Sequence, residues 1–157
     1  MGFASLFTGA GEGARVELPA LGIVMRVLVP AAGAGGQLAM IEETTGPGRG
    51  PPLHVHHRQT ETFLFLEGEY EILVGDRRFR AAPGVSAVVP PGVPHAFRNV
   101  GAAPGRLAFV LSPALEGEAF FAALAAATEA GMPDQAALDE LARRFSTEVV
   151  GPPLGAA

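Results

Sequence analysis

The sequence predicts an all-β fold, a sandwich or barrel of short strands, followed by two C-terminal α-helices. Most of the 21 Gly and 14 Pro residues lie within residues 1–113, where they separate short apolar runs. These runs recur about every 8–12 residues, which is the spacing typical of a sandwich or barrel. After Pro113 the chain becomes rich in Ala and takes on helical periodicity.

Eight apolar runs are the candidate strands of a barrel that extends over about residues 20–113. None of them shows helical periodicity, and turn-forming residues bound each of them. They cover residues 22–29, 37–43, 62–66, 70–74, 78–81, 85–89, 95–100 and 106–112.

The first predicted helix covers residues 116–130. It places Phe120, Leu124 and Ala127 on one apolar stripe and stops at Gly131, a residue suited to end a helix.

A second helix is expected to begin at Pro133, which suits a first helical turn. Its apolar residues follow the i, i+3, i+4, i+7 pattern at Leu138, Leu141, Ala142 and Phe145. We expect these helices, over about residues 115–146, to cover an end or edge of the barrel, so that residues 1–157 form a single domain. The last segment is expected to add a short strand.

Composition excludes several classes of function. The chain has no Cys, which removes thiol nucleophiles, disulfides and thiolate metal sites. All eleven basic residues are Arg, so a Schiff-base lysine is absent as well. The net charge is −5 without a basic block, and no stretch is apolar enough to span a bilayer. We therefore expect neither a nucleic acid nor a membrane as partner.

Four residues are candidates for a metal site. His54 and His56 are separated by one residue, and on a strand this spacing puts two side chains on the same face about 6.5–7 Å apart. Glu61 opens the next strand after a short connection, and His95 begins another strand after the turn-forming sequence PPGVP. Three imidazoles and one carboxylate form a mixed site suited to one divalent Fe, Mn, Ni, Co, Cu or Zn ion.

Each of these side chains also has an ordinary structural interpretation. A single histidine is usually a surface residue or a satisfied core residue, and His57 fits that interpretation because strand alternation turns it away from His56. That explanation is weaker for a His pair on one face. Glu61 precedes the apolar run TFLFL, where a carboxylate without a cation is costly.

Two motifs resemble the signatures of the cupin superfamily. Residues 48–68 have the pattern G-x5-H-x-H-x4-E-x6-G, and residues 84–99 have the pattern G-x5-P-x-G-x2-H-x3-N. All signature positions are filled, and fifteen residues separate the two motifs. More narrowly, the layout of one barrel with a helical tail resembles small bacterial cupins described as quercetinase-like.

The resemblance implies a double-stranded β-helix, also called a jelly-roll barrel, and a mononuclear metal centre. The metal ligands that it implies are His54, His56, Glu61 and His95, with Glu61 also acting as a catalytic base. It further implies that Gly68, Gly84 and Gly92 are turn residues, that Pro90 sets the approach to His95, and that Asn99 ties down a turn.

Strand alternation predicts an aromatic cavity beside the metal. Phe63 and Phe65 share the face of Glu61, and Phe97 shares the face of His95. We also expect Phe109 and Met40 to line the barrel and to contact substrate. Arg26 is a candidate to face inward. Such a cavity suits a flat or weakly polar compound.

The leading functional hypothesis is a metal-dependent dioxygenase that acts with O2 on a small aromatic or enolic, flavonol-like compound. The alternatives are a non-catalytic cupin that binds a small molecule or metal, and a metal-dependent isomerase or epimerase. We expect a homodimer that uses the strand at 22–29. The first fourteen residues do not resemble a secretory signal, so a cytoplasmic location is expected.

Overall fold

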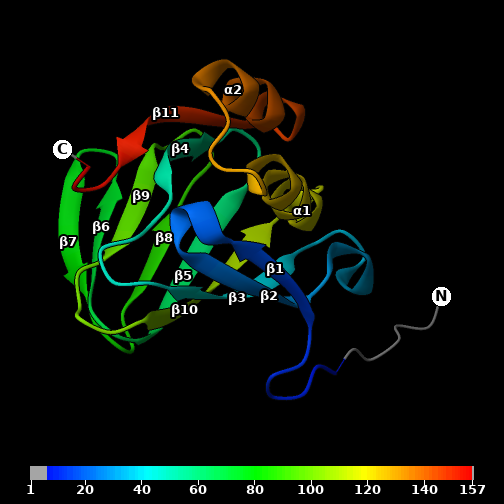
Figure 1. The fold of residues 1–157 in the computed structure, drawn as a ribbon. Coiled ribbons are helices and arrows are strands. Elements are labelled where there is room, and N and C mark those ends of the chain that lie inside the picture. Colours follow the sequence, from blue (N-terminus) through cyan, green and yellow to red (C-terminus); the bar gives the residue numbers. More distant parts are fainter. Residues whose placement is uncertain (1–6, 157) are drawn as a thin grey trace.

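The computed structural model describes residues 7–156 and consists of two β-sheets with a pair of helices beside them (Figure 1). Its regular elements in chain order are β1 (Ala14–Leu18), the 3-10 helix η1 (Pro19–Leu21), β2 (Ile23–Val29), the 3-10 helix η2 (Ala31–Ala34), β3 (Ala39–Thr45), β4 (Pro52–His56), β5 (Thr60–Glu67), β6 (Tyr70–Val74), β7 (Arg77–Ala81), β8 (Ser86–Val89), β9 (His95–Asn99), β10 (Gly105–Ser112), α1 (Gly117–Thr128), α2 (Gln135–Arg144) and β11 (Thr147–Pro153).

The strands form two antiparallel sheets that enclose the core. One sheet has six strands in the order β1-β2-β3-β10-β5-β8, and the other has five in the order β11-β4-β9-β6-β7. Consecutive strands pair in β1-β2-β3 and in β6-β7, whereas other neighbours are far apart in the sequence, as in the pairings of β10 with β3 and of β4 with β9. This arrangement confirms the all-β fold that the strand pattern predicted and the jelly-roll barrel that the family resemblance implied.

Alternation along the strands decides which side chains enter the core. In β5, Phe63 and Phe65 are fully buried, whereas Leu64 between them is exposed. β3 repeats the pattern with Ala39 and Ile41 inward. Because neighbouring residues of a strand point to opposite faces, every second residue builds the core between the sheets.

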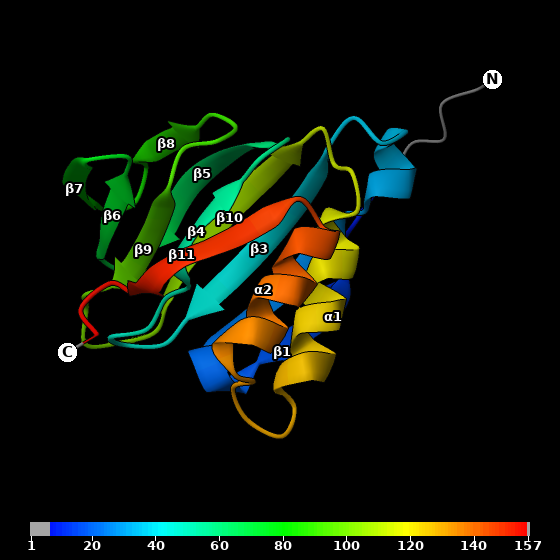
Figure 2. The same ribbon diagram turned by 90° about the horizontal axis from the view of Figure 1, so that it is seen from above.

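The two helices connect an edge of one sheet to an edge of the other. α1 packs against β1, α2 packs against β11, and the helices also contact each other (Figure 2). Since β1 and β11 are edge strands of different sheets, the helical pair covers the opening between the two sheets. The sequence predicted that the helices would cover an end or edge of the barrel, and the structure confirms this.

The helix boundaries and the buried stripe differ in detail from the prediction. Phe121 is the buried aromatic residue of α1, and Ala127 is exposed. Pro133 lies outside α2, whose N-cap is Asp134; the Asp134 side chain accepts a hydrogen bond from the backbone N–H of Ala137. The prediction failed at Ala127 because an Ala-rich helix shows little contrast between its faces.

β1 was not predicted, and it changes the expected dimer edge. The strand at 22–29, found here as β2, pairs with β3 on one side and with β1 on the other. It is therefore an interior strand and cannot supply the sheet edge of a dimer, so the expectation that a homodimer uses this strand is wrong; the homodimer itself stays a prediction. Because Gly residues precede β1, its short alternating sequence did not stand out as a strand.

No helix within residues 7–156 is long and apolar enough to cross a bilayer. Residues 1–6, the first part of the segment considered for a secretory signal, lie outside the described residues.

Candidate metal centre

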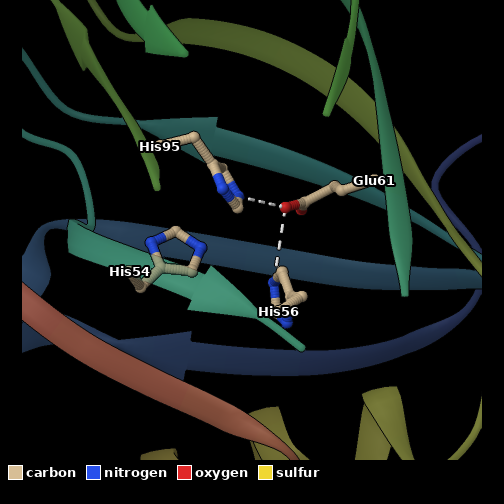
Figure 3. Close-up of side chains that lie close together, drawn as sticks. All are labelled: His54, His56, Glu61 and His95. Atoms are coloured by element: carbon tan, nitrogen blue, oxygen red, sulfur yellow. Dashed lines mark hydrogen bonds and ion pairs between the residues drawn. The ribbon is translucent and has the colours of Figure 1, made fainter. Parts of the chain in front are cut away.

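Three strands bring four polar side chains together between the sheets (Figure 3). His54 and His56 come from β4, His95 comes from β9 in the same sheet, and Glu61 comes from β5 in the opposite sheet. One donor atom from each of the four residues lies within 4.8 Å of the others. Glu61 Oε2 is 2.7 Å from His95 Nε2 and 3.4 Å from His56 Nε2.

The register of the five-stranded sheet positions the three imidazoles. His54 pairs directly with His95 across β4 and β9, and His56 pairs with Thr147 of β11 on the other side of β4. The site thus depends on pairings between segments that are distant in the sequence.

Each imidazole is oriented by a hydrogen bond that its Nδ1 atom forms. The acceptors are the backbone carbonyl of Pro52 for His54, at 2.8 Å, and that of Val93 for His95, at 3.0 Å. For His56 the acceptor is Thr147 Oγ1, at 3.1 Å. When Nδ1–H donates to such a partner, the lone pair of a neutral ring lies on Nε2, where it can bind a metal ion.

The surroundings of the Glu61 carboxyl group keep it ionised. Burial raises the pKa of the Glu61 carboxyl, but hydrogen bonds and charge interactions with His56 and His95 outweigh that effect and lower the pKa below its usual range. Burial and the neighbouring His95 and His56 lower the pKa of His54 to about 3. For His95, burial lowers the pKa, but the Glu61 carboxylate reverses the sign and the net pKa is raised.

These donors fit a transition-metal ion. Two ligands on opposite sides of one ion lie about 4.2 Å apart when each bond is about 2.1 Å long, which is close to the observed spread of up to 4.8 Å. Three oriented imidazoles and an ionised carboxylate form a mixed nitrogen and oxygen donor set. Together with the Nδ1 hydrogen bonds, this makes the cluster a candidate metal centre.

His57 does not join the cluster. Its Nε2 forms an exposed ion pair with Glu148 at 2.9 Å, on the outer side of the sheet. The expectation that strand alternation turns His57 away from His56 is confirmed.

A small apolar cavity of about 70 Å³ adjoins the metal centre. The metal-binding side of its wall is formed by His54, His56 and Glu61, and the opposite side by α1 and α2. Few of its lining groups are polar, because most of the wall consists of aliphatic and aromatic side chains, among them Met25, Phe97, Phe109, Phe121 and Leu138.

Only some of the five residues predicted to contact substrate line the cavity. Phe97 and Phe109 do so. Phe63 and Phe65 face the same side as Glu61 but are fully buried deeper in the core, where the Phe63 ring lies 5.6 Å from that of Phe97. Phe63 and Phe65 therefore support the wall without forming its surface.

For two residues, the side of the sheet on which the side chain was expected to lie was wrong. In β3 the inward residues are Ala39, Ile41 and Glu43, so Met40 lies on the outer face and does not line the cavity. Arg26 likewise points outward and forms an ion pair with Glu42. The assumed strand register was off by one residue, and that error reverses the face of every side chain.

Glu43, which no sequence motif singled out, lines the cavity and is 2% exposed. Burial and the nearby charge of Glu61 raise the pKa of its carboxyl to about 8, although a hydrogen bond from Thr45 acts in the opposite direction. The signal available in the sequence was a carboxylate at an inward position of an alternating strand. No such signal in the sequence pointed to Thr147, because this residue lies 91 positions from His56, the histidine that it orients.

The glycine turns of the two motifs are formed as the resemblance implied. Gly68, Gly84 and Gly92 all have positive φ angles, which favour glycine. The Asn99 side chain donates to the carbonyl oxygens of Thr45 and Ala103 and accepts from the Gly101 N–H, so it holds the turn that follows β9.

Comparison with known proteins gives the same family. Residues 41–111 match the Cupin domain family. The chain is 31% identical over 87 residues to the HTH-type transcriptional regulator PuuR of Escherichia coli, which corresponds to 55% of this chain and 46% of the regulator. It is also 31% identical over 75 residues to quercetin 2,3-dioxygenase of Bacillus subtilis, which corresponds to 48% of this chain and 22% of that enzyme. The chain thus spans less than half the length of either relative.

A solved structure supports the fold independently. An RmlC-like cupin from Shewanella frigidimarina superposes with a TM-score of 0.62 at 21% identity, over 73% of this chain and 96% of that one. The two sequence motifs, the two enclosing sheets and the four convergent donors agree with this match: residues 41–111 form a cupin domain, and the chain has the fold of cupins.

Proposed function

We propose that this protein is a metal-dependent dioxygenase that acts on a small aromatic or enolic compound. The observation that carries the proposal is the position of the candidate metal centre at the wall of an apolar, aromatic-lined cavity. The likeness to quercetin 2,3-dioxygenase of Bacillus subtilis supports this reaction class. A divalent cation held by His54, His56, Glu61 and His95 would supply a Lewis acid and a template for substrate and dioxygen.

The protein's own residues perform three tasks in this proposal. Phe97 and Phe109 hold the flat body of the substrate, and the two helices exclude water from the cavity. Glu61 accepts the hydroxyl proton of the substrate on the carboxylate oxygen that does not face His56 and His95; its contacts with these histidines keep the carboxylate ionised. Substrate oxygen atoms then face the metal side of the cavity and its apolar part faces the helices.

The cavity limits the size of the substrate. Sites for drug-sized ligands usually enclose about 300–1,000 Å³, whereas this cavity encloses about 70 Å³. A one-ring catechol or a short 1,3-diketone suits it better than a three-ring flavonol, which needs the helices to move apart. We therefore rank the single-ring and open-chain compounds first.

The test is oxygen uptake by protein reconstituted with each candidate divalent metal and offered a flavonol, a catechol and a 1,3-diketone. We expect uptake with at least one compound that depends on the metal and is lost in His54→Ala. His57→Ala, which changes a histidine outside the cluster, is the matched control. No uptake with any metal and any of these compounds contradicts the proposal.

A binding role without turnover is the second candidate, and the likeness to the regulator PuuR favours it. In that case the same compounds bind tightly and are recovered unchanged in the presence of oxygen. Conversion of a compound without oxygen consumption indicates instead an isomerase or epimerase.

A further inference from the structure

The cavity contains a second acidic side chain, Glu43, that is outside the candidate metal centre. It lies on β3 of the six-stranded sheet, between the inward residues Ile41 and Thr45. It lines the same cavity as His54 and Glu61, but it is not one of the four residues whose donor atoms converge. Its role is therefore separate from holding the cation.

The hydrogen bonds of Glu43 leave one oxygen atom available. Its Oε1 accepts a hydrogen bond of 2.8 Å from Thr45 Oγ1. Within residues 7–156, no side chain or backbone group is hydrogen-bonded to Oε2, and no basic residue forms an ion pair with the carboxyl. Its sequence neighbour Glu42, on the outer face of the same strand, forms ion pairs with Arg26 and Arg106 instead.

A carboxyl group in this environment stays neutral. Burying an unpaired carboxylate in an apolar cavity is costly, and the ionised Glu61 nearby adds repulsion. Both effects act in the direction of the raised pKa of about 8. A neutral carboxyl group has one O–H donor, and because Oε1 is already engaged by Thr45, that donor belongs on Oε2.

We propose that Glu43 contacts the molecule that binds at the metal centre and donates a hydrogen bond from its carboxyl Oε2 to an oxygen atom of that molecule. The inference rests on the proposed function, because it requires a small molecule in this cavity. It narrows the substrate class: the compound carries two oxygen atoms on adjacent or alternate carbons, one directed at the metal and the other at Glu43. Catecholates and the enolates of 1,3-diketones have this arrangement.

The choice of variants follows from the contacts. Glu43→Gln keeps the size of the side chain and an N–H donor, whereas Glu43→Met keeps the approximate size and removes the donor. Met is flexible enough to fill the cavity without strain. Glu42→Gln removes a carboxyl group from the outer face of the same strand and is the matched control.

The probe is 4-nitrocatechol, whose visible spectrum changes when a hydroxyl group loses its proton as it binds a metal ion. Each variant is loaded with Co²⁺, its metal content is measured by elemental analysis, and the probe is titrated. We expect all variants to take up Co²⁺ as the wild type does. Relative to wild type, Glu42→Gln and Glu43→Gln should bind the probe within about 3-fold, and Glu43→Met at least 10-fold more weakly, as loss of a buried hydrogen bond predicts.

Two results overturn the inference in different ways. If wild type and Glu43→Met bind the probe equally well, Glu43 does not contact the ligand, but the proposed function stands. If the Co²⁺-loaded wild type does not bind the probe, the inference is overturned, whereas the proposed function is tested separately by the oxygen-uptake experiment.

A folding defect in Glu43→Met would have one identifiable cause, the Thr45 hydroxyl left without its partner. The double variant Glu43→Met/Thr45→Val removes both partners together, which usually costs little stability. It is expected to fold and to bind the probe as weakly as Glu43→Met. Probe binding by the folded double variant at wild-type strength overturns the inference.

Discussion

His54 and His95 lie directly opposite each other on the antiparallel strands β4 and β9, with their ring centroids 4.3 Å apart. Burial and the proximity of His95 disfavour a proton on His54 and lower its pKa to about 3. His54 is therefore neutral at physiological pH, which is the state in which an imidazole binds a metal ion.

The paired histidines of β4 should be essential for metal uptake. Replacement in the double variant His54→Ala/His56→Ala removes two of the four donors, so the purified protein is expected to contain no stoichiometric transition metal. Elemental analysis of protein prepared without added metal makes the measurement and also identifies the ion. His57→Ala should keep the wild-type metal content; retention of the ion by the double variant would contradict the assigned site.

Thr147 should influence metal affinity although it does not reach the ion. Thr147→Val removes the hydroxyl that orients His56 through Nδ1. Loss of such a partner usually lowers metal affinity about 10–100-fold, and competition with a chromogenic chelator measures the change. Thr62→Val, on the outer face of β5, is the control. Equal affinities in Thr147→Val and wild type would show that the hydroxyl does not orient the ring.

Glu43 should make stability dependent on pH in the metal-free protein. The unfolded chain loses the Glu43 proton near pH 4.5, whereas the folded protein keeps it up to about pH 8. Between these values the folded state binds more protons, so the free energy of unfolding falls as pH rises. Glu43→Gln cannot titrate and should gain stability relative to wild type across this window, on the order of 5 kcal/mol above pH 8.

Urea unfolding of the two metal-free proteins at a series of pH values measures this difference. Glu42→Gln serves as control because it removes a carboxyl group that is paired on the outer face. A stability difference between Glu43→Gln and wild type that stays flat from pH 4.5 to pH 8 would show that Glu43 ionises normally.

Phe121 should limit the size of the ligand. It extends from α1 to Phe109, and the two ring centroids are 5.7 Å apart. Phe121→Ala is expected to lower the free energy of unfolding by about 3 kcal/mol and to enlarge the cavity towards the helices. Flavonol binding should then strengthen relative to catechol binding, as a titration of the Co²⁺-loaded protein with each compound would show.

Leu64→Ala is the control for this change, because Leu64 is an apolar residue on the outer face that does not line the cavity. An unchanged ratio of flavonol to catechol affinity in Phe121→Ala would mean that the helices do not restrict the ligand.

Much of the fold and of the cluster was predictable because it depends on local spacing. A His-x-His pair on a strand defines a shared face, and the turn glycines with positive φ angles lie where the motifs place them. Strand boundaries were also recognisable, since Gly and Pro separate the apolar runs.

Features that depend on register or on distant pairing were not predictable. Met40 was assigned to the wrong face because one residue of register reverses a strand, and Glu43 was missed for the same reason. The contact between His56 and Thr147 links positions 91 residues apart. No local pattern marks a threonine that becomes important only when β11 pairs with β4.

The pairing of β11 with β4 has a consequence for biosynthesis. The ribosome makes the histidines of β4 long before it makes Thr147, so the growing chain holds its imidazoles without the hydroxyl that fixes one of them. We therefore expect high-affinity binding of an ion at the candidate metal centre only after translation of β11, and weaker binding by a nascent chain that ends earlier.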